Sequence, residues 1–336
     1  MNVNDSKAPT RGQSFYYAGL ITVIFIWSVS PVINPYIYVD ISPTIASFIT
    51  GLVSVLSLIP IAIKNFSHFN ARLLKVAIPT GIINSVASLI QKIGLLYTTP
   101  SRYAFLENIS CVIVPILMFI LVRKKPTVTK IISSLICLFG CFLLSGAGSG
   151  GGGIGIGEIL CALAGILYGI NIAITATFAA RIYAPLYIFI HMAVHTVTSG
   201  ISAIALDVIT FNGEPISEAY FEWNFALIAL LVVVSLLSNT FCWIVRTNVM
   251  KHIDATVVAI MMPFSAVITG VLSVLLGMDT ISPSLIFGAI AMLIATILSG
   301  LSDSFEKKKM LAELNSNAHK ISSELQNEEK RADAVL

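Results

Sequence analysis

Ten apolar stretches of about 17 to 23 residues take up most of the 336-residue sequence. A helix rises about 1.5 Å per residue, so roughly 20 apolar residues cross the ~30 Å hydrocarbon core of a bilayer. The stretches lack the alternation of apolar and polar residues that is typical of membrane barrels, and they therefore predict ten transmembrane helices. The predicted helices are Tyr16–Tyr36, Thr44–Ile63, Val76–Tyr97, Arg102–Val122, Ile131–Ala147, Glu158–Ala180, Pro185–Leu206, Asn224–Val245, Ala255–Leu276 and Ser284–Leu301.

The composition excludes a soluble fold and makes the lipid bilayer the main surroundings of the chain. Hydrophobic residues make up 56% of the sequence and charged residues 11%, whereas a soluble domain carries about 25% charged residues. The net charge is only +3 and the basic residues are scattered, which argues against a nucleic-acid partner. The five cysteines lie inside apolar stretches without CxxC spacing, so neither a metal site nor a cofactor is predicted. The predicted fold class is an all-α polytopic membrane protein.

The basic residues predict the orientation of the helices, because such residues are retained on the cytoplasmic side during insertion. Alternate loops and helix ends are basic, whereas the opposite loops contain acidic residues but no Lys or Arg. Both termini are therefore expected to be cytoplasmic, in a bacterial-type inner membrane, with an uncleaved first span. The basic residues on the predicted cytoplasmic side are Lys7, Arg11, Lys64, Arg72, Lys75, Arg123, Lys124, Lys125, Lys130, Arg181, Arg246, Lys251 and Lys307 to Lys309.

A weak internal repeat divides the ten predicted helices into two groups of five. At an offset of 154 residues, Ser101 to Phe105 aligns with Ala255 to Ala259. Because five is an odd number, the second group is inverted, as in transporters whose halves exchange conformations. We therefore expect an N-terminal cytosolic tail over residues 1–15, repeats over 16–147 and 158–301, a glycine-rich external linker over 148–157 and a charged cytosolic tail over 302–336.

Ionisable side chains inside a predicted span are the first candidates for chemistry, because each costs about 2.5 to 3.5 kcal/mol to insert. Lys92 and Glu107 lie at similar depths on the third and fourth predicted helices, and Arg102 lies one turn nearer the outside. The cations Lys92 and Arg102 suit an anionic or zwitterionic substrate. The alternative is an ion pair between Lys92 and Glu107 that only holds the two helices together.

His191 and His195 stand four residues apart on one face of the seventh predicted helix. Histidine titrates near neutral pH, so these two residues, together with Glu107, are candidates for proton coupling. The spacing also occurs in metal sites, but no third ligand accompanies it here. Histidines that only hydrogen-bond to a neighbouring helix are the alternative.

Polar and aromatic side chains within the predicted spans supply candidates for the lining of a central cavity. Trp27 and Tyr168 align between the two halves at a slightly smaller offset. An inverted repeat would bring them together near the midplane, where transporters bind their substrates. Other polar side chains are expected to join helices by hydrogen bonds. The full set is Trp27, Asn34, Asn84, Gln91, Asn108, Tyr168, Asn171, Asn239 and Trp243.

Three short stretches resemble the drug/metabolite transporter superfamily, specifically its EamA-type members with two tandem five-helix repeats. They are IWSVSPVI from Ile26 to Ile33, YTTPSRYAFLENISCVIVPIL from Tyr97 to Leu117, and DATVVAIMMPFSAVITGVLSVLLGMDTIS from Asp254 to Ser282. The family's acidic residue after the fourth helix is replaced by the basic run from Arg123 to Lys125, and Asp279 follows Gly277 only after Met278. The resemblance implies a basket of helices around a central cavity, with the fifth and tenth helices at the periphery.

Together, the repeat and the resemblance predict a secondary active transporter that exports a small organic metabolite, such as an amino acid or a drug-like compound, by alternating access. The sequence contains no Walker A motif to bind ATP and no motif of an intramembrane enzyme, so an enzyme is not expected. A non-transporting membrane scaffold or sensor is the alternative function. The sequence leaves open whether the protein is a monomer or a homodimer.

Overall fold

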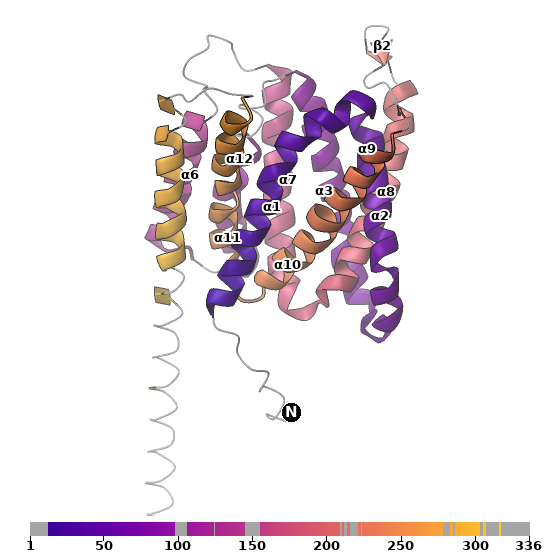
Figure 1. The fold of residues 1–336 in the computed structure, drawn as a ribbon. Coiled ribbons are helices and arrows are strands. Elements are labelled where there is room, and N and C mark those ends of the chain that lie inside the picture. Colours follow the sequence, from indigo (N-terminus) through magenta and orange to yellow (C-terminus); the bar gives the residue numbers. More distant parts are fainter. Residues whose placement is uncertain are drawn as a thin grey trace, which may run out of the picture.

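The computed structural model is a bundle of helices (Figure 1). It describes residues 13–97, 106–123, 125–144, 155–208, 210–211, 214–215, 221–222, 224–277, 283–284, 286–302, 305–306 and 316. Arg102, most of the glycine-rich linker and most of the C-terminal tail lie outside the described residues. The backbone of Lys92 is described, but its side chain is not.

Seven helices among the described residues are long and apolar enough to cross a membrane, and three shorter apolar helices accompany them. The three shorter helices overlap the fourth, fifth and tenth predicted spans. In chain order the helices are α1 (Gln13–Asp40), α2 (Pro43–Lys64), η1 (Phe66–His68), α3 (Ala71–Leu96), α5 (Ser110–Val122), α6 (Val128–Leu144), α7 (Ile156–Phe178), η2 (Ala179–Arg181), α8 (Ala184–Val208), α9 (Phe225–Val234), η3 (Ser235–Phe241), α10 (Cys242–Val249), α11 (Ala255–Met261), α12 (Phe264–Leu275) and an apolar helix over Ile286–Ser302.

Several helices extend beyond the predicted spans, because polar residues at a helix end leave the hydrocarbon region without ending the helix. α3 begins at Ala71, where the side chain of Asn70 accepts a hydrogen bond from the backbone N–H of Leu73 at 2.9 Å. The eighth helix is predicted to end at Val245, but α10 continues to Val249. Arg246 therefore lies inside a helix and not in a cytoplasmic loop.

Two spans are interrupted. The ninth is divided into α11 and α12 next to Pro263, where the proline removes one backbone N–H donor from the helix. The eighth consists of α9, the π-helical segment η3 and α10. The proline interruption follows from the sequence, whereas the π-helical segment was not predicted.

The loop after α8, which the charge pattern assigns to the external side, contains a short hairpin. Strand β1 (Thr210–Phe211) pairs antiparallel with strand β2 (Glu214–Pro215). Farther along, the backbone N–H of Glu222 donates to the carbonyl of Asp40 at 2.7 Å. This contact places residue 222 at the same end of the bundle as the end of α1.

Many large apolar side chains face outward, and many small polar side chains are buried, unlike in a soluble protein. Phe25, Ile201 and Phe225 are exposed, at 57%, 63% and 83% of their possible surface. The fully buried side chains include Ser28, Ser54 and Thr80. Such a distribution is stable only if lipid covers the outer surface.

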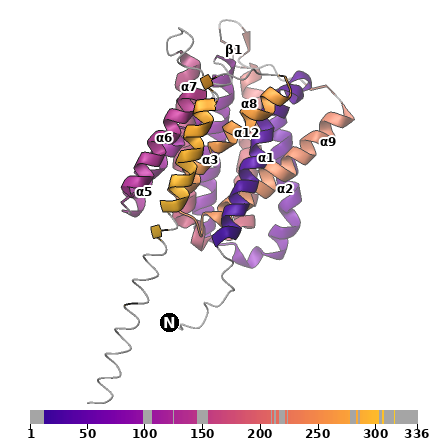
Figure 2. The same ribbon diagram turned by 60° about the vertical axis from the view of Figure 1, so that its left-hand side comes forward.

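Helices from the two predicted halves are interleaved. α2 packs along α8, α3 packs along α7 and α8, and α1 packs against α10 and α12. In Figure 1, η3 and α10 run obliquely across the bundle next to α1. Figures 1 and 2 show α6 beside the helix Ile286–Ser302 at one edge, where Gly140 packs against Met292. These two helices still contribute to the interior, because Cys137, Cys141, Met292 and Ala295 form a buried core cluster with residues of α5 and α11.

Candidate functional site

An aromatic cluster surrounds the guanidinium group of Arg246 where α1 and α10 meet. Arg246 Cζ lies 4.7 Å from the ring centroid of Trp243 and 5.7 Å from that of Trp27. The two indole rings contact each other edge to face, with centroids 5.9 Å apart. Cation–π attraction to the two ring faces holds the guanidinium in the interior.

The π-helical segment η3 fixes Trp27 in this cluster. Trp27 Nε1 donates a hydrogen bond to the backbone oxygen of Ser238 at 3.1 Å, and the hydroxyls of Ser30 and Ser238 lie 3.3 Å apart. π-Helical turns occur frequently at functional sites, because the wider turn alters which backbone groups are available. The segment thus joins α1 to the eighth span at the level of the cluster.

The helix α8 adds a histidine and a tyrosine to the cluster. The ring centroid of His191 lies 4.7 Å from that of Trp243 and 5.6 Å from that of Tyr187. The hydroxyl of Tyr187 lies 2.9 Å from the hydroxyl of Thr80 and 2.9 Å from that of Thr175. Tyr187 therefore ties α8 to α3 and α7. His191 is fully buried, and neither of its ring nitrogens has a hydrogen-bond partner among the described protein atoms.

Arg246 is a buried cation without a carboxylate partner in the described part of the chain. It is 6% exposed, and its Nε has no hydrogen-bond partner there. The titratable groups that interact with its charge are Tyr168, Tyr187 and His191. None of these carries a negative charge at neutral pH. The described protein atoms therefore leave the charge of Arg246 uncompensated.

A second polar group lies between α3 and α7. The hydroxyl of Tyr168 donates to Gln91 Oε1 at 2.6 Å, and Glu107 lies near the same glutamine. Tyr168 interacts electrostatically with both Glu107 and Arg246. This tyrosine therefore connects the second polar group to the aromatic cluster.

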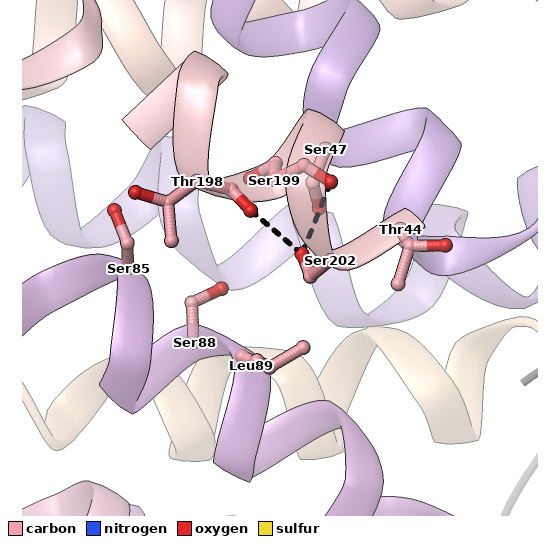
Figure 3. Close-up of a pocket in the computed structure, with 8 residues that line it drawn as sticks. All are labelled: Thr44, Ser47, Ser85, Ser88, Leu89, Thr198, Ser199 and Ser202. Atoms are coloured by element: carbon pink, nitrogen blue, oxygen red, sulfur yellow. Dashed lines mark hydrogen bonds between the residues drawn. The ribbon is translucent and has the colours of Figure 1, made fainter. Parts of the chain in front are cut away.

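A cavity of about 10 Å³, lined almost entirely by hydroxyl groups, lies between α2, α3 and α8 (Figure 3). Its volume is that of about one water molecule. Two of its wall residues contact His195: Ser85 Oγ lies 3.2 Å from Nδ1, and Ser199 Oγ lies 3.5 Å from Nε2. His195 is thus adjacent to the cavity and one helical turn from His191. The lining residues are Thr44, Ser47, Ser85, Ser88, Leu89, Thr198, Ser199 and Ser202.

The structure brings together part of the candidate set from the sequence. Trp27, Trp243 and His191 meet around Arg246, and Gln91, Tyr168 and Glu107 form the second group. Asn171 joins α7 to α3, because its Nδ2 donates to the backbone oxygen of Thr80 at 2.8 Å. Among the described residues, no group of three His, Cys, Asp or Glu side chains is suited to hold a metal ion.

The remaining candidates lie apart from these groups or outside the described residues. Asn34 on α1 and Asn239 on η3 are half-buried, and Asn108 lies in the turn before α5. Asn84 is buried on α3. The side chain of Lys92 and all of Arg102 are not described, so the expected ion pair between Lys92 and Glu107 is still a prediction.

Sequence reasoning missed Arg246, because the predicted span ended one residue before it. A signal for it was present in the repeat. At the offset of 154 residues that aligns the two halves, Lys92 aligns with Arg246. The sequence marks Lys92 as an intramembrane cation, and the repeat extends this expectation to Arg246. Lys251, by contrast, lies in the turn after α10, where burial lowers its pKa.

Comparison with known proteins assigns the first half of the chain. Residues 14–146 match the family model described as the EamA-like transporter family. This segment is similar to members of that family. The family is part of the drug/metabolite transporter superfamily, so the resemblance found in the sequence is confirmed. Members of the EamA-like family are membrane transporters of small molecules, and the match indicates this class of function for the chain.

The helices of the EamA-like segment pack against those of the second half. The fold as a whole is similar to that of a solved structure. A crystal structure described only as that of a protein superposes with a TM-score of 0.69, at 15% identity, over 87% of this chain and 98% of that chain. At this identity the likeness concerns the fold alone. No curated protein matches the chain. The EamA-like segment contributes Trp27 and Gln91 to the site, and the second half contributes Arg246.

Proposed function

We propose that the protein is a secondary active transporter that exports a small organic metabolite by alternating access. The observation that carries this proposal is a set of buried polar atoms without hydrogen-bond partners among the described protein atoms, inside a bundle with many large apolar side chains on its outer surface. Each such atom costs about 1 to 3 kcal/mol unless a ligand or water satisfies it. Those in or next to the two polar groups are Gln91 Nε2, Asn171 Oδ1, both ring nitrogens of His191, and Arg246 Nε, and Asn84 Oδ1 on α3 is a further one.

The packing of the helices supports an inverted repeat, on which alternating access depends. In an inverted repeat, each contact between two spans has a counterpart between the equivalent spans of the other half. The contact of α3 with α7 corresponds to that of the eighth span with α1, and the contact of α5 with α7 corresponds to that of the ninth span with α1. The pair α2 and α8 is converted into itself. All of these pairs are in contact in the described structure.

We propose that a proton gradient across the membrane drives the transport. His195 borders the hydroxyl-lined cavity and lies one helical turn from His191 of the aromatic cluster. Hydroxyl groups and histidines can pass protons along hydrogen bonds, and histidine changes its charge near neutral pH. Glu107 is a further candidate, because it lies near Gln91, which accepts a hydrogen bond from Tyr168.

The proposed setting is a bacterial-type inner membrane with both termini in the cytoplasm. α2 ends at Lys64 and α3 begins after Asn70, next to the exposed Arg72. The opposite end of the bundle carries Asp40 and Glu222, which are joined by a backbone hydrogen bond. This separation of charge fits the retention of basic residues in the cytoplasm.

Transport by the purified full-length protein in liposomes tests the proposal. Efflux and uptake of labelled amino acids and aromatic metabolites are measured with and without a pH gradient. We expect gradient-dependent movement of at least one compound, absent from protein-free liposomes and reduced by Trp27→Ala. Phe25→Ala is the matched control, because Phe25 lies on the same helix but faces outward. Gradient-independent traces for every compound would favour a non-transporting scaffold or sensor.

A further inference from the structure

The strongest unexplained feature of the interior is the charge of Arg246. A guanidinium group has five N–H donors in a planar fork that matches a carboxylate or a phosphate. Contacts with the faces of Trp27 and Trp243 stabilise the positive charge but provide no oxygen acceptor. In the described part of the chain, Nε of this side chain has no hydrogen-bond acceptor, and no carboxylate is among the groups that interact with its charge. A buried cation of this kind is stable when an anion pairs with it.

We propose that Arg246 is the recognition site for a carboxylate group on a small organic anion with a flat apolar body. The inference rests on the proposed transport function and names the class of its substrate. Arg246 supplies one positive charge, so a singly charged carboxylate compensates it, whereas a doubly charged phosphate would leave a buried negative charge. The two indole rings provide apolar faces for the body of the substrate.

His191 supplies a second donor for the same carboxylate. Its ring lies 4.7 Å from Trp243, which also contacts Arg246, so the imidazole and the guanidinium border the same indole ring. Both ring nitrogens of His191 lack a hydrogen-bond partner among the described protein atoms. A neutral imidazole carries one N–H group and can therefore donate to a carboxylate oxygen. The site thus combines one charged fork, one neutral donor and two aromatic walls.

Calorimetric titration of the purified full-length protein in detergent tests the inference with benzoate as the probe. Benzamide is its neutral isostere, benzylamine its cationic counterpart and phenyl phosphate the alternative anion. We expect benzoate to bind at least about tenfold more tightly than benzamide, because one charge-assisted hydrogen-bond pair distinguishes them. Benzylamine is expected not to bind. Equal binding of benzamide and benzoate, or tighter binding of phenyl phosphate, would overturn the assignment of a carboxylate.

Variants localise the binding. Arg246→Gln is expected to weaken benzoate binding at least about tenfold, and Arg246→Lys to restore part of it, because lysine keeps the charge but loses the planar fork. His191→Gln is expected to weaken it by a smaller factor. Arg72→Gln is the matched control, because Arg72 is exposed at the end of α3. Unchanged benzoate binding by a folded Arg246→Gln protein contradicts the inference. Should that variant not fold, the comparison of benzoate with benzamide on the native protein decides.

The outcome also separates this inference from the proposed function. If liposomes move a cationic or neutral compound and Arg246→Gln leaves that movement unchanged, the carboxylate site is wrong and transport stands. If the native protein binds benzoate but moves no solute in either direction, the carboxylate site stands and the transport proposal is wrong.

Discussion

Ser85 on α3 places its hydroxyl oxygen 3.2 Å from Nδ1 of His195 on α8. The contact joins a helix of the EamA-like segment to a helix of the second half. On its other side, His195 faces Ser199, so both ring nitrogens lie near hydroxyl groups of the cavity wall. A histidine in this position can exchange protons with the cavity without leaving the interior.

We expect His195→Gln to abolish the dependence of transport on the pH gradient while leaving exchange of substrate down its own gradient. Glutamine keeps hydrogen-bonding capacity but cannot carry a proton at neutral pH. The measurement compares gradient-driven uptake with counterflow in the same liposomes. His68→Gln is the control, because His68 is exposed and lies outside the spans. Loss of counterflow together with gradient-driven uptake would instead show that His195 serves structure or substrate binding.

Close helix packing leads to a second prediction. A Cβ atom added to Gly165 on α7 would press on the backbone oxygen of Leu106 and lie 3.0 Å from that of Glu107. Backbone atoms cannot move aside as the end of a side chain can. Gly165→Ala is therefore expected to destabilise the protein by about 1 to 3 kcal/mol, measured as a lower melting temperature in detergent.

Gly300→Ala is the matched control for this prediction. The nearest atom to an added Cβ there is Tyr17 Cε1, at the ordinary contact distance of 3.9 Å. The same substitution is expected to leave the melting temperature unchanged or to raise it slightly, because alanine is the better helix former. Equal destabilisation at Gly165 and Gly300 would mean that the close approach of α7 to residues 106 and 107 does not exist.

The sequence predicts most of the helices because the bilayer imposes one simple rule, a long apolar stretch for each crossing. The rule does not say where a helix ends once its residues become polar, which is why the eighth span was predicted to stop before Arg246. Nor does it reveal η3, since a π-helical turn has no apolar pattern of its own. Trp27 and Trp243 were recognised as lining residues because aromatic side chains are conspicuous within apolar spans.

The partners of a side chain are harder to predict, because they depend on which helices meet. His191 and His195 are equivalent in the sequence pattern, but the structure gives His195 two hydroxyl neighbours and leaves His191 beside Trp243. Lys130 was assigned to a cytoplasmic loop by its charge. The structure buries its side chain at 2% exposure and pairs it with Asp254 and Glu306.

This ion cluster leads to a third prediction. Lys130 Nζ lies 2.9 Å from Glu306 Oε2 and 3.6 Å from Asp254 Oδ2, and Asp254 also caps the start of α11. Lys130→Gln removes one cation from beside two carboxylates, of which Asp254 is 9% exposed. We expect a loss of about 1 to 3 kcal/mol of stability, measured as a lower melting temperature in detergent. Lys125→Gln, which alters an exposed residue, is expected to have little effect.

Orientation in the membrane is tested by single cysteines. The five native cysteines are buried, so a membrane-impermeant maleimide should not label the native protein in intact cells. Glu222→Cys and Lys64→Cys both replace exposed residues, at opposite ends of the bundle. If basic residues are retained in the cytoplasm, the reagent labels Glu222→Cys in intact cells and labels Lys64→Cys only after the membrane is opened. The reverse pattern would place both tails outside, and a gradient that drives export in the proposed orientation would then drive uptake.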